Sequence, residues 1–456
     1  MNILCAYNAN IDSINHIDGQ ELSRMLEEST EFQDKFQEKL VNPPGSISSK
    51  SDFFAGLLLC MRDGTGAEWL IHDKEVFEWL KKTFLNDSLM RMGGNMGIMA
   101  NVLSELGASK VVPNVASLSK LQASFFSQKA IFHPYDGKLY NSKEIGAILP
   151  ANNNRPELIH FVFDFKKGDT VNFSGDIISV PRENRFIATY DLLNFQLHLN
   201  EHFRDYSMKN TAEMDGAIIS GFHMLQEDEE GSEKNDYKLK LDTSLKQLQS
   251  WKEARKDLYI HVEFGHFSSG KIASYAFSIL SPIVDRIGMN EDELAMLASI
   301  NGMDPKPILA MDSVAIAESA IKLCSDFGLC RMLVHTREFA LSVSCRTDDD
   351  PEKTINAMDF GAGCAAAFAC SGKLTDRGEL LTIASNIPKS EFGKAASSKL
   401  AKHIEEEWKC SNTCGIHMSY LVTIVPTRIC DEPVSTVGLG DTISAAIFLR
   451  ELELNS

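Results

Sequence analysis

The sequence lacks a long hydrophobic run, an excess of positive charge and a closely paired cysteine motif. Its longest apolar stretches, such as residues 53–61, fall far short of the roughly 20 residues that a membrane-spanning helix needs. The amino terminus has no basic segment followed by an apolar stretch, so we expect no signal peptide. These absences predict a cytoplasmic protein without a membrane segment.

Acidic residues outnumber basic ones, because 63 Asp and Glu stand against 45 Lys and Arg, and the formal net charge is −18. Such a surface repels nucleic acid and anionic lipid, so we expect neither as a partner. An acidic excess also suits a salty cytoplasm, which we keep as a hypothesis. With 44% hydrophobic residues, the 456-residue chain has the composition of a soluble globular protein with a sizeable core.

The 10 cysteines include no C-x-x-C pair. The closest two, Cys410 and Cys414, have no accompanying His or Cys pair at zinc-finger spacing. We therefore expect free thiols in a reducing compartment and no zinc site built on cysteine.

Short β-branched runs alternate with longer helical patterns along most of the chain. The expected strands are residues 2–7, 110–114, 216–220, 258–264, 331–335 and 421–425. The expected helices include residues 97–106, 237–256, 291–300 and 313–327. This alternation predicts an α/β fold in which helices flank a mostly parallel sheet.

Two segments break this alternation. Residues 13–90 are mainly charged helix, and residues 131–190 carry short alternating strands. We therefore predict a large α/β domain formed by residues 1–12, 91–130 and 191–456, and a smaller α+β domain formed by residues 13–90 and 131–190.

The stretch V-G-L-G-D at residues 437–441 opens a run of small and apolar residues at helical spacing. Gly438, Leu439 and Gly440 could direct backbone N–H groups toward an anion at a helix N-terminus. Asp441 could accept a proton from a hydroxyl beside that anion. The simpler interpretation is a helix-starting turn with an acid in its first turn. A second glycine pair, D-F-G-A-G-C at 359–364, lacks the carboxylate, which favours a packing role there.

His261 and Glu263 in the apolar strand L-Y-I-H-V-E-F point to one face near its carboxyl end, where α/β sheets bind ligands. Glu263 is a candidate magnesium ligand. His261 bonded to a backbone carbonyl, and zinc held by His261, Glu263 and His266, are alternatives. Glu293 in G-M-N-E-D-E is a further metal candidate, although its spacing from Asn290 equally predicts a capping box.

Asn10 and Asp12 in N-A-N-I-D share a strand face and can bond to vicinal hydroxyls. Gly93 and Gly94 in M-G-G-N let a backbone approach closely. Such clusters suit a sugar, although strand ends and helix starts use these residue types routinely.

Together, N-A-N-I-D, G-G-N, H-V-E-F, G-M-N-E-D-E, V-H-T and P-V-S-T-V-G-L-G-D-T resemble the archaeal ADP-dependent glucokinase and phosphofructokinase family, within the ribokinase-like superfamily. The resemblance spans residues 6–449. It implies a ribokinase-like large domain with a smaller lid domain, ADP as phosphoryl donor, AMP as product, and Mg²⁺ or another divalent cation. We expect a monomer that binds only small molecules.

The same resemblance assigns roles to individual residues. Asp441 matches the catalytic base, and the anion hole matches Gly438, Leu439 and Gly440. The acids that organise the metal match Glu263, Glu293 and Asp441. Sugar-contacting positions match Asn10, Asp12, Gly94 and Asn95. The adenine pocket of the family matches His335, Val434 and Val437.

The resemblance also bears on the sugar. Glu68 matches the acid by which family members accept glucose, and Arg185 matches an arginine that binds a sugar phosphate, with Lys166, Lys167 and Arg182 nearby. Two positions argue against a sugar phosphate as substrate. Asp191 stands where a second phosphate-binding arginine would align, and Leu158 stands where a lysine would align. We interpret the chain as a bifunctional ADP-dependent phosphofructokinase and glucokinase. The alternatives are an ADP-dependent glucokinase alone, an ATP-dependent ribokinase-like kinase and a non-catalytic sensor.

Overall fold

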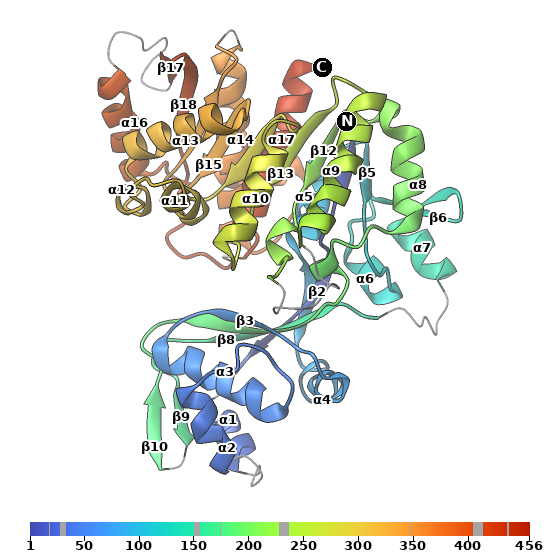
Figure 1. The fold of residues 1–456 in the computed structure, drawn as a ribbon, viewed down its shortest axis with the longest axis vertical. Coiled ribbons are helices and arrows are strands. Elements are labelled where there is room, and N and C mark those ends of the chain that lie inside the picture. Colours follow the sequence, from blue (N-terminus) through green and yellow to red (C-terminus); the bar gives the residue numbers. More distant parts are fainter. Residues whose placement is uncertain are drawn as a thin grey trace. The chain divides into compact units, whose positions relative to one another are not determined.

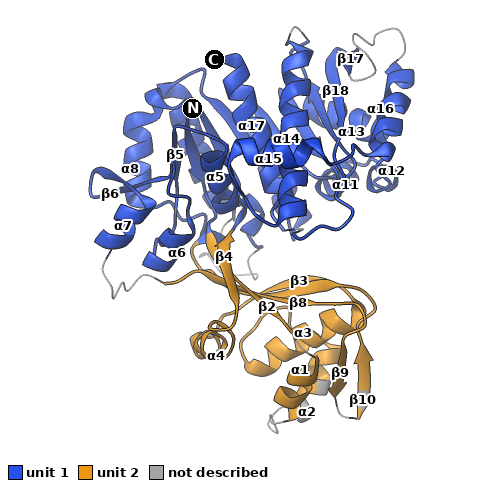
Figure 2. Cartoon of the chain, turned by 180° about the vertical axis from the view of Figure 1, so that it is seen from behind, with its two compact units in different colours: residues 1–9, 94–153, 194–456 blue, residues 10–93, 154–193 orange. Residues whose placement is uncertain are grey.

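The computed structural model describes residues 1–17, 19–27, 33–149, 156–173, 175–227, 237–347, 349–404, 414–435 and 437–456. The chain forms two compact units, drawn in blue and orange in Figure 2. Unit 1 comprises residues 1–9, 94–153 and 194–456, and unit 2 comprises residues 10–93 and 154–193. Within the described ranges, no helix is long and apolar enough to cross a membrane.

Unit 1 is built on one large sheet (Figure 1). Its described residues form nine strands in the order β17-β18-β16-β15-β14-β13-β12-β1-β5. The strands are β1 (Asn2–Ala6), β5 (Lys110–Pro113), β12 (Gly216–Ile219), β13 (Tyr259–Glu263), β14 (Arg286–Met289), β15 (Arg331–His335), β16 (Phe339–Ser344), β17 (Cys414–His417) and β18 (Tyr420–Pro426). Neighbours from β5 to β15 are parallel, and the pairs beyond β15 are antiparallel. The carboxyl ends of the parallel strands therefore meet at one edge, where α/β sheets bind ligands.

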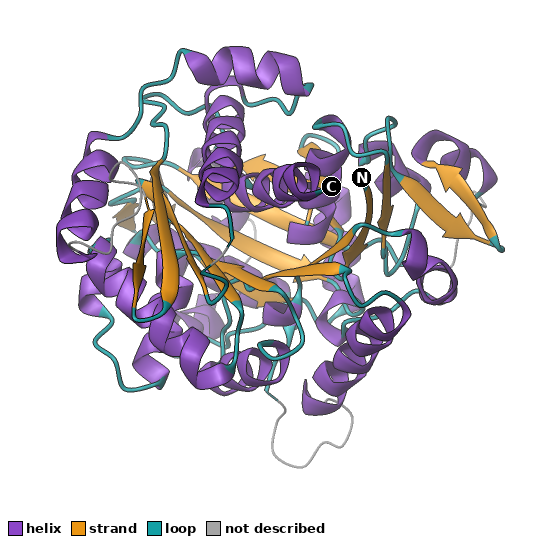
Figure 3. Ribbon diagram, turned by 90° about the horizontal axis from the view of Figure 1, so that it is seen from above, coloured by secondary structure: helices purple, strands orange, loops and turns teal. Residues whose placement is uncertain are grey.

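Helices cover both faces of this sheet (Figure 3). One apolar core includes side chains of α9 (Tyr237–Ala254), α10 (Gly270–Leu280), α11 (Glu291–Ile300), α13 (Ser313–Phe327) and α16 (Glu391–Ile404). The other includes side chains of α14 (Pro351–Ser371) and α17 (Leu439–Asn455). Strand β15 contributes Met332 and Val334 to the first core and Leu333 to the second, as expected for a strand buried on both faces. The remaining elements are α5 (Asn95–Glu105), α6 (Lys120–Phe125), α7 (Ser142–Ile148), α8 (Glu201–Asn210), α12 (Lys306–Leu309), α15 (Arg377–Ser385), β6 (Phe132–Tyr135) and β7 (Lys138–Asn141).

Unit 2 holds a sheet whose described residues form five strands in the order β3-β11-β8-β2-β4. These strands are β2 (Asn10–His16), β3 (Ala67–Leu70), β4 (Leu89–Gly93), β8 (Ile159–Phe165) and β11 (Asn184–Tyr190). The other elements are α1 (Gly19–Glu27), α2 (Gln33–Val41), α3 (Lys50–Asp63), α4 (Lys74–Phe84), and the antiparallel pair β9 (Thr170–Phe173) and β10 (Asp176–Ser179). The core is aromatic, because the ring of Phe53 on α3 lies with its centroid 5.0 Å from that of Phe163 and 6.0 Å from that of Phe186.

The predicted α/β fold class is confirmed, but the division of the chain differs at residues 131–153. We assigned this segment to the smaller domain, and it belongs to unit 1. Residues 10–12, 91–93 and 191–193, which we assigned to the large domain, belong to unit 2. The chain stays on unit 1 after β5, because Ile131 bridges to Val111 and the Ala130 N–H donates to Ser104 Oγ over 3.0 Å. Alternating side chains predict a strand without saying which sheet it joins.

Candidate active site

The turn before α17 has the conformation that an anion site needs. Gly438 caps the helix with a φ of 79°, in the left-handed region that favours glycine. The N–H of Thr442 (2.9 Å) and its Oγ1 (2.7 Å) both donate to the carbonyl of Gly438, which closes the first turn. The first N–H groups of an α-helix lack acceptors within the helix, and the helix dipole adds positive potential there. The turn is therefore a helix start, as the simpler interpretation predicted, and it is also suited to an anion.

Asp441 lies in this first turn, with 8% of its surface exposed. Its Oδ1 accepts a hydrogen bond of 2.8 Å from Nδ2 of Asn95, the first residue of α5. The Oδ1 of Asn95 in turn accepts a hydrogen bond of 3.3 Å from Nδ2 of Asn8. Gly94, with a φ of 75°, is the N-cap of α5 directly before Asn95. Asn95, which we predicted to contact the sugar, therefore orients the carboxylate of Asp441.

A cavity of about 460 Å³ opens beside this turn in unit 1. It is lined by Leu439, Gly440 and Ile443 of α17, by Ala362, Ala365, Ala366 and Ala369 of α14, and by residues that include His335, Asn290, Arg428 and Pro433. Its volume suits a small organic ligand. The glycine- and alanine-rich stretch of α14, which we assigned to packing, thus also forms a cavity wall. Val434 and Val437, predicted for the adenine pocket, do not line the cavity, and Val434 is 71% exposed.

One residue of the cavity wall forms a disulfide. Cys430 lines the cavity and is bonded to Cys370 near the end of α14, which lies 60 residues earlier in the chain. The expectation of free thiols is therefore wrong for this pair. Cys414 is also disulfide-bonded, and Cys410 lies outside the described residues.

Glu263 is buried at the carboxyl end of β13 and is bonded to two imidazoles. Its Oε1 lies 2.7 Å from Nε2 of His335, and its Oε2 lies 3.2 Å from Nε2 of His261. Burial alone would raise the pKa of Glu263, but the charge of His335 and both hydrogen bonds hold that pKa well below its usual range. Burial opposes the charge on His335, yet Glu263 raises the pKa of His335 to about 9. His335 is therefore an ionised partner of Glu263 as well as a residue of the cavity wall.

A buried network behind Glu263 escaped the sequence analysis. Nε of Arg286 on β14 donates to Nδ1 of His261 over 2.9 Å, and Nη1 of Arg286 bonds to Glu451 of α17. Burial, together with the charge of Arg286, lowers the pKa of His261 to about 4. His261 therefore bonds to side chains and not to the backbone carbonyl of our alternative. The available signal was an arginine at the start of the short apolar strand R-I-G-M.

Gly288, in the middle of β14, makes room for this arrangement. A Cβ at this position would stand 2.5 Å from Oε2 of Glu263 and 2.7 Å from Cε1 of His261. Any other residue would push the pair away from the strand, so the glycine is required by close approach.

Glu293 closes a capping box at the start of α11, which confirms that interpretation. Its N–H donates to Oδ1 of Asn290 over 2.9 Å, and its carboxylate accepts from the N–H (3.0 Å) and Nδ2 (3.1 Å) of Asn290. Burial, followed by the charges of Glu263 and Asp441, raises the pKa of Glu293 to about 7.

The alternative zinc set of His261, Glu263 and His266 does not converge in the described structure, where His266 is exposed and the other two are buried.

Asn10 and Asp12 lie on one face of β2 in unit 2, and Nδ2 of Asn10 donates to Oδ1 of Asp12 over 2.8 Å. They belong to a second strand, because β1 stops at Ala6 and β2 begins at Asn10. Gly93 on β4 leaves room for them, since a Cβ there would stand 2.0 Å from Oδ1 of Asp12. Nε of Arg91 lies 3.8 Å from Oδ2 of Asp12 and makes no hydrogen bond to a described residue. Arg91 was not among the predicted site residues, although it directly precedes the M-G-G-N stretch.

Glu68 lies on β3 of unit 2, where it accepts a hydrogen bond of 2.6 Å from Oγ1 of Thr189. Nδ1 of His160 lies 3.5 Å from Glu68, and Nε2 of His160 lies 3.1 Å from Oδ2 of the buried Asp191. Burial lowers the pKa of His160, but the hydrogen bond to Asp191 and the charges of Glu68 and Asp191 give a net rise above 6.5. Asp191 therefore has an imidazole partner whose raised pKa favours the charged form. Arg185 is half-buried on β11.

Known proteins resemble this chain over nearly its full length. Residues 1–450 match the ADP-specific Phosphofructokinase/Glucokinase conserved region. The chain is 30% identical to the ADP-dependent glucose/glucosamine kinase of Pyrococcus furiosus, over 98% of this chain and 94% of that protein. It is 27% identical to the ADP-specific phosphofructokinase of the same organism, over 100% of this chain and 97% of that protein. A solved ADP-dependent kinase complex with fructose-6-phosphate and ADPbetaS is 29% identical and has a TM-score of 0.77, over 99% of this chain and 93% of that one.

These matches explain the arrangement of the large sheet and its helices. The fold is ribokinase-like, as in the relatives of known structure. Glu263 is the last residue of β13, at the edge where the carboxyl ends of the parallel strands meet. The chain belongs to the ADP-specific phosphofructokinase/glucokinase family.

Proposed function

We propose that this chain is a kinase that transfers the β-phosphate of ADP to fructose 6-phosphate and to glucose, with AMP as the other product. The observation that carries the proposal is the placement of Asp441. This buried carboxylate is oriented by Asn95, in the first turn of a helix whose start borders a cavity of about 460 Å³. One helical turn thereby combines a base with an anion site. The names of the two Pyrococcus furiosus relatives support both acceptors.

In the proposed reaction, Asp441 accepts the proton of the sugar hydroxyl while the hydroxyl oxygen forms a bond to the β-phosphorus of ADP. The bond between this phosphorus and the oxygen of AMP breaks, and AMP leaves with the electron pair. The N–H groups at Gly438, Leu439 and Gly440 donate to the phosphoryl oxygens. The nucleoside of ADP occupies the cavity beside α14, and the alanines there leave space for a flat base.

A divalent cation, Mg²⁺ in our proposal, would be held by Glu263, Glu293 and Asp441. The donor set fits, because Mg²⁺ prefers oxygen, and the pKa of about 7 for Glu293 reflects burial among like charges that a cation would relieve. The carboxylate oxygens of Glu263 already bond to imidazoles, and those of Glu293 bond to Asn290. We therefore expect these two acids to contact the cation through water. When bound, the ion would supply positive charge to neutralise the phosphates.

Most of the residues that the family resemblance assigns to the sugar acceptor lie in unit 2. Asn10 and Asp12 offer an amide and a carboxylate to sugar hydroxyls, and Glu68 offers a carboxylate to glucose. Arg185 and Arg91 are the cations that we assign to the phosphate of fructose 6-phosphate, because both are partly buried and neither forms a close ion pair in the described structure.

One observation favours the second candidate, a glucokinase without phosphofructokinase activity. Asp191 replaces an arginine that we expected, and Leu158 is buried with 2% exposure, so neither supplies a cation. The pairing of Asp191 with His160, whose pKa is raised, offsets the negative charge. We therefore retain both sugars in the proposal.

A coupled assay that crosses ADP and ATP with glucose and fructose 6-phosphate tests the function. We expect turnover with ADP on both sugars. Activity with ATP alone would establish an ATP-dependent kinase, and sugar binding without turnover on either nucleotide would establish a sensor. Activity with ADP on glucose alone would leave the second candidate. We also propose a cytoplasmic monomer, and light scattering at assay concentrations tests its oligomeric state.

A further inference from the structure

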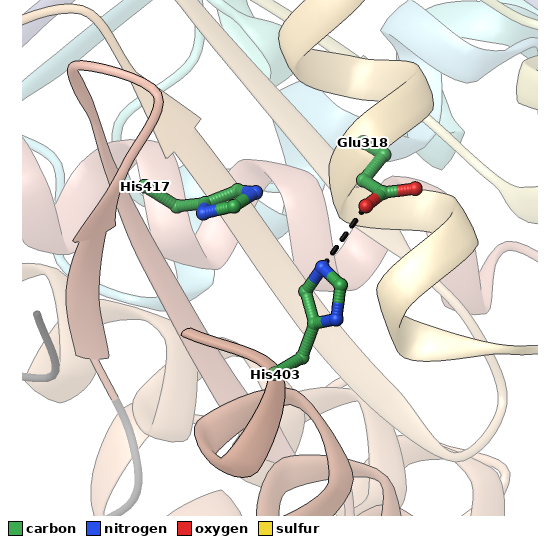
Figure 4. A group of neighbouring side chains, drawn as sticks. All are labelled: Glu318, His403 and His417. Carbon is green, nitrogen blue, oxygen red and sulfur yellow. Dashed lines mark hydrogen bonds and ion pairs between the residues drawn. The ribbon is translucent and has the colours of Figure 1, made fainter. Parts of the chain in front are cut away.

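Three potential metal ligands converge at one place in unit 1 (Figure 4). Glu318 comes from α13, His403 from the last turn of α16, and His417 from the end of β17. One ligand atom of each lies within 4.8 Å of those of the other two. Nε2 of His403 lies 2.9 Å from Oε1 of Glu318, and the rings of His403 and His417 have centroids 5.4 Å apart. Among the described residues, these three lie outside the lining of the cavity beside α17.

A simple ion pair between His403 and Glu318 does not account for His417. The Nε2 of His417 is buried, yet it makes no hydrogen bond to any residue in the described ranges. Buried polar nitrogens nearly always have a partner, because leaving one unpaired costs free energy. The ring extends toward the other two side chains (Figure 4), so this nitrogen is available to a ligand placed between them.

We propose that Glu318, His403 and His417 bind a divalent transition-metal ion, with Zn²⁺ favoured. Two imidazoles and one carboxylate form a donor set that zinc accepts, with water in a remaining position. With zinc bonds of about 2.0–2.2 Å, the ligand atoms of a tetrahedral site stand roughly 3.4 Å apart. The side chains of His403 and Glu318 are 38% and 46% exposed, so they can rotate to reach this spacing. Magnesium prefers oxygen ligands and does not suit the two imidazoles.

Two lysines lie near the proposed zinc ligands and affect how well a cation binds there. Lys399 and Lys402 line the same surface hollow as Glu318 and His403. Lys402 opposes a cation, whereas Lys399 is neutralised by Asp312 at 2.7 Å. This second pair already joins α16 to α13, one helical turn before His403. A metal ion would add β17 to the contact, so the site stabilises this edge of the sheet and takes no part in phosphoryl transfer.

Zinc alone is the probe in the main experiment. The full chain is titrated by calorimetry in millimolar Mg²⁺, which occupies oxygen-rich sites. We expect the unaltered chain to bind Zn²⁺, and His403→Ala and His417→Ala to weaken this binding at least about tenfold each. The matched control is Lys399→Ala, which removes the neighbouring ion pair between the same helices and should bind Zn²⁺ like the unaltered chain. Zinc should raise the thermal unfolding midpoint of the control but not of the two histidine variants.

Cobalt identifies the ligands without any substitution. Co²⁺ bound to the unaltered chain should give visible absorption without thiolate-to-metal charge-transfer bands, and its binding should weaken as acid protonates the imidazoles. Thiolate bands would assign the ion to cysteines and overturn the proposal. It would also be overturned if the unaltered chain bound no Zn²⁺, or if a variant lacking both histidines bound it with equal affinity. Turnover with ADP decides the proposed function separately.

Discussion

At the scale of single residues, Asp441 is the group on which the proposed chemistry depends. Asp441→Ala should lower kcat by about 10²–10⁴-fold, the usual contribution of a general base, and should leave sugar affinity nearly unchanged. Asn95→Ala should have a smaller effect, because the carboxylate remains but loses its 2.8 Å hydrogen bond. Steady-state kinetics and sugar calorimetry check both. Near-normal turnover of Asp441→Ala would refute its role as base.

Glu68 is the residue that should separate the two sugars. Glu68→Ala removes the carboxylate that we assign to a glucose hydroxyl, and a hydrogen bond to a charged group contributes about 1.5–3 kcal/mol. We therefore expect kcat/KM for glucose to fall by about 10- to 100-fold, with a much smaller change for fructose 6-phosphate. Thr189→Val is the matched control, because it removes only the hydroxyl bonded to Glu68. Equal losses on both sugars would remove Glu68 from the explanation of specificity.

His160 predicts a pH dependence. Its folded-state pKa is raised above 6.5, so its charged form stabilises the fold. This contribution is fully present below about pH 6.5 and is lost as the pH rises through the folded-state pKa. The unfolding free energy of the unaltered chain should therefore exceed that of His160→Gln most at low pH, and the difference should shrink as the pH rises. Urea denaturation at a series of pH values measures it. A pH-independent difference would contradict the assignment.

Residue types were predictable from the sequence, but their partners were not. Asn95 was expected to contact sugar and bonds to Asp441, 346 positions away. His335 was expected in the adenine pocket, and it lines the cavity but also pairs with Glu263, 72 positions away. Such contacts depend on how strands and helices are packed, and no local pattern encodes them. A motif match also does not establish burial. Val434 matches a position of the family's adenine pocket, yet the residue is 71% exposed.

At the scale of elements, the Cys370–Cys430 disulfide links α14 to the segment that leads to α17. A loop of 60 residues closed by a disulfide stabilises a fold by about 4 kcal/mol through the lost freedom of the unfolded chain. Cys370→Ser should therefore lower the unfolding free energy by about 2–4 kcal/mol. It should also raise the KM for ADP, because Cys430 lines the cavity. Cys345→Ser, which alters an exposed free cysteine, is the control. Unchanged stability in Cys370→Ser would count against the bond.

Periodicity placed several helices and strands well, including the four-residue strands β5 and β12. The bounds of α11, α13 and β15 are those predicted. Strand β14 was missed, because its four residues begin with Arg286 and include Gly288, which break an apolar pattern. Both residues serve the site, since Arg286 supports His261 and Gly288 makes room for Glu263. Sequence patterns therefore failed where the requirements of the site override those of a regular strand.

At the scale of the whole molecule, the two-unit organisation follows from breaks in the α/β alternation. The unit boundaries were harder to predict. Residues 10–12 lie in β2 of unit 2, and residues 131–153 remain on unit 1. A strand's own residues establish its period, but hydrogen bonds to a distant strand establish its sheet. For this reason the alternating residues of the β6–β7 hairpin could not be distinguished from those of a strand in unit 2.

The net charge of −18 makes stability depend on salt. Like charges repel one another more in the folded state than in the expanded one, and added KCl screens them. The Debye length falls from about 10 Å at 0.1 M to about 3 Å at 1 M, so the effect should be largest at low salt. We expect the thermal unfolding midpoint to rise steeply up to roughly 0.3 M KCl and then level off. Sucrose, which acts by exclusion from the surface, should raise it without a plateau. A midpoint independent of KCl in the low range would show that the acidic residues form only a solvated surface, and that they are no adaptation to salt.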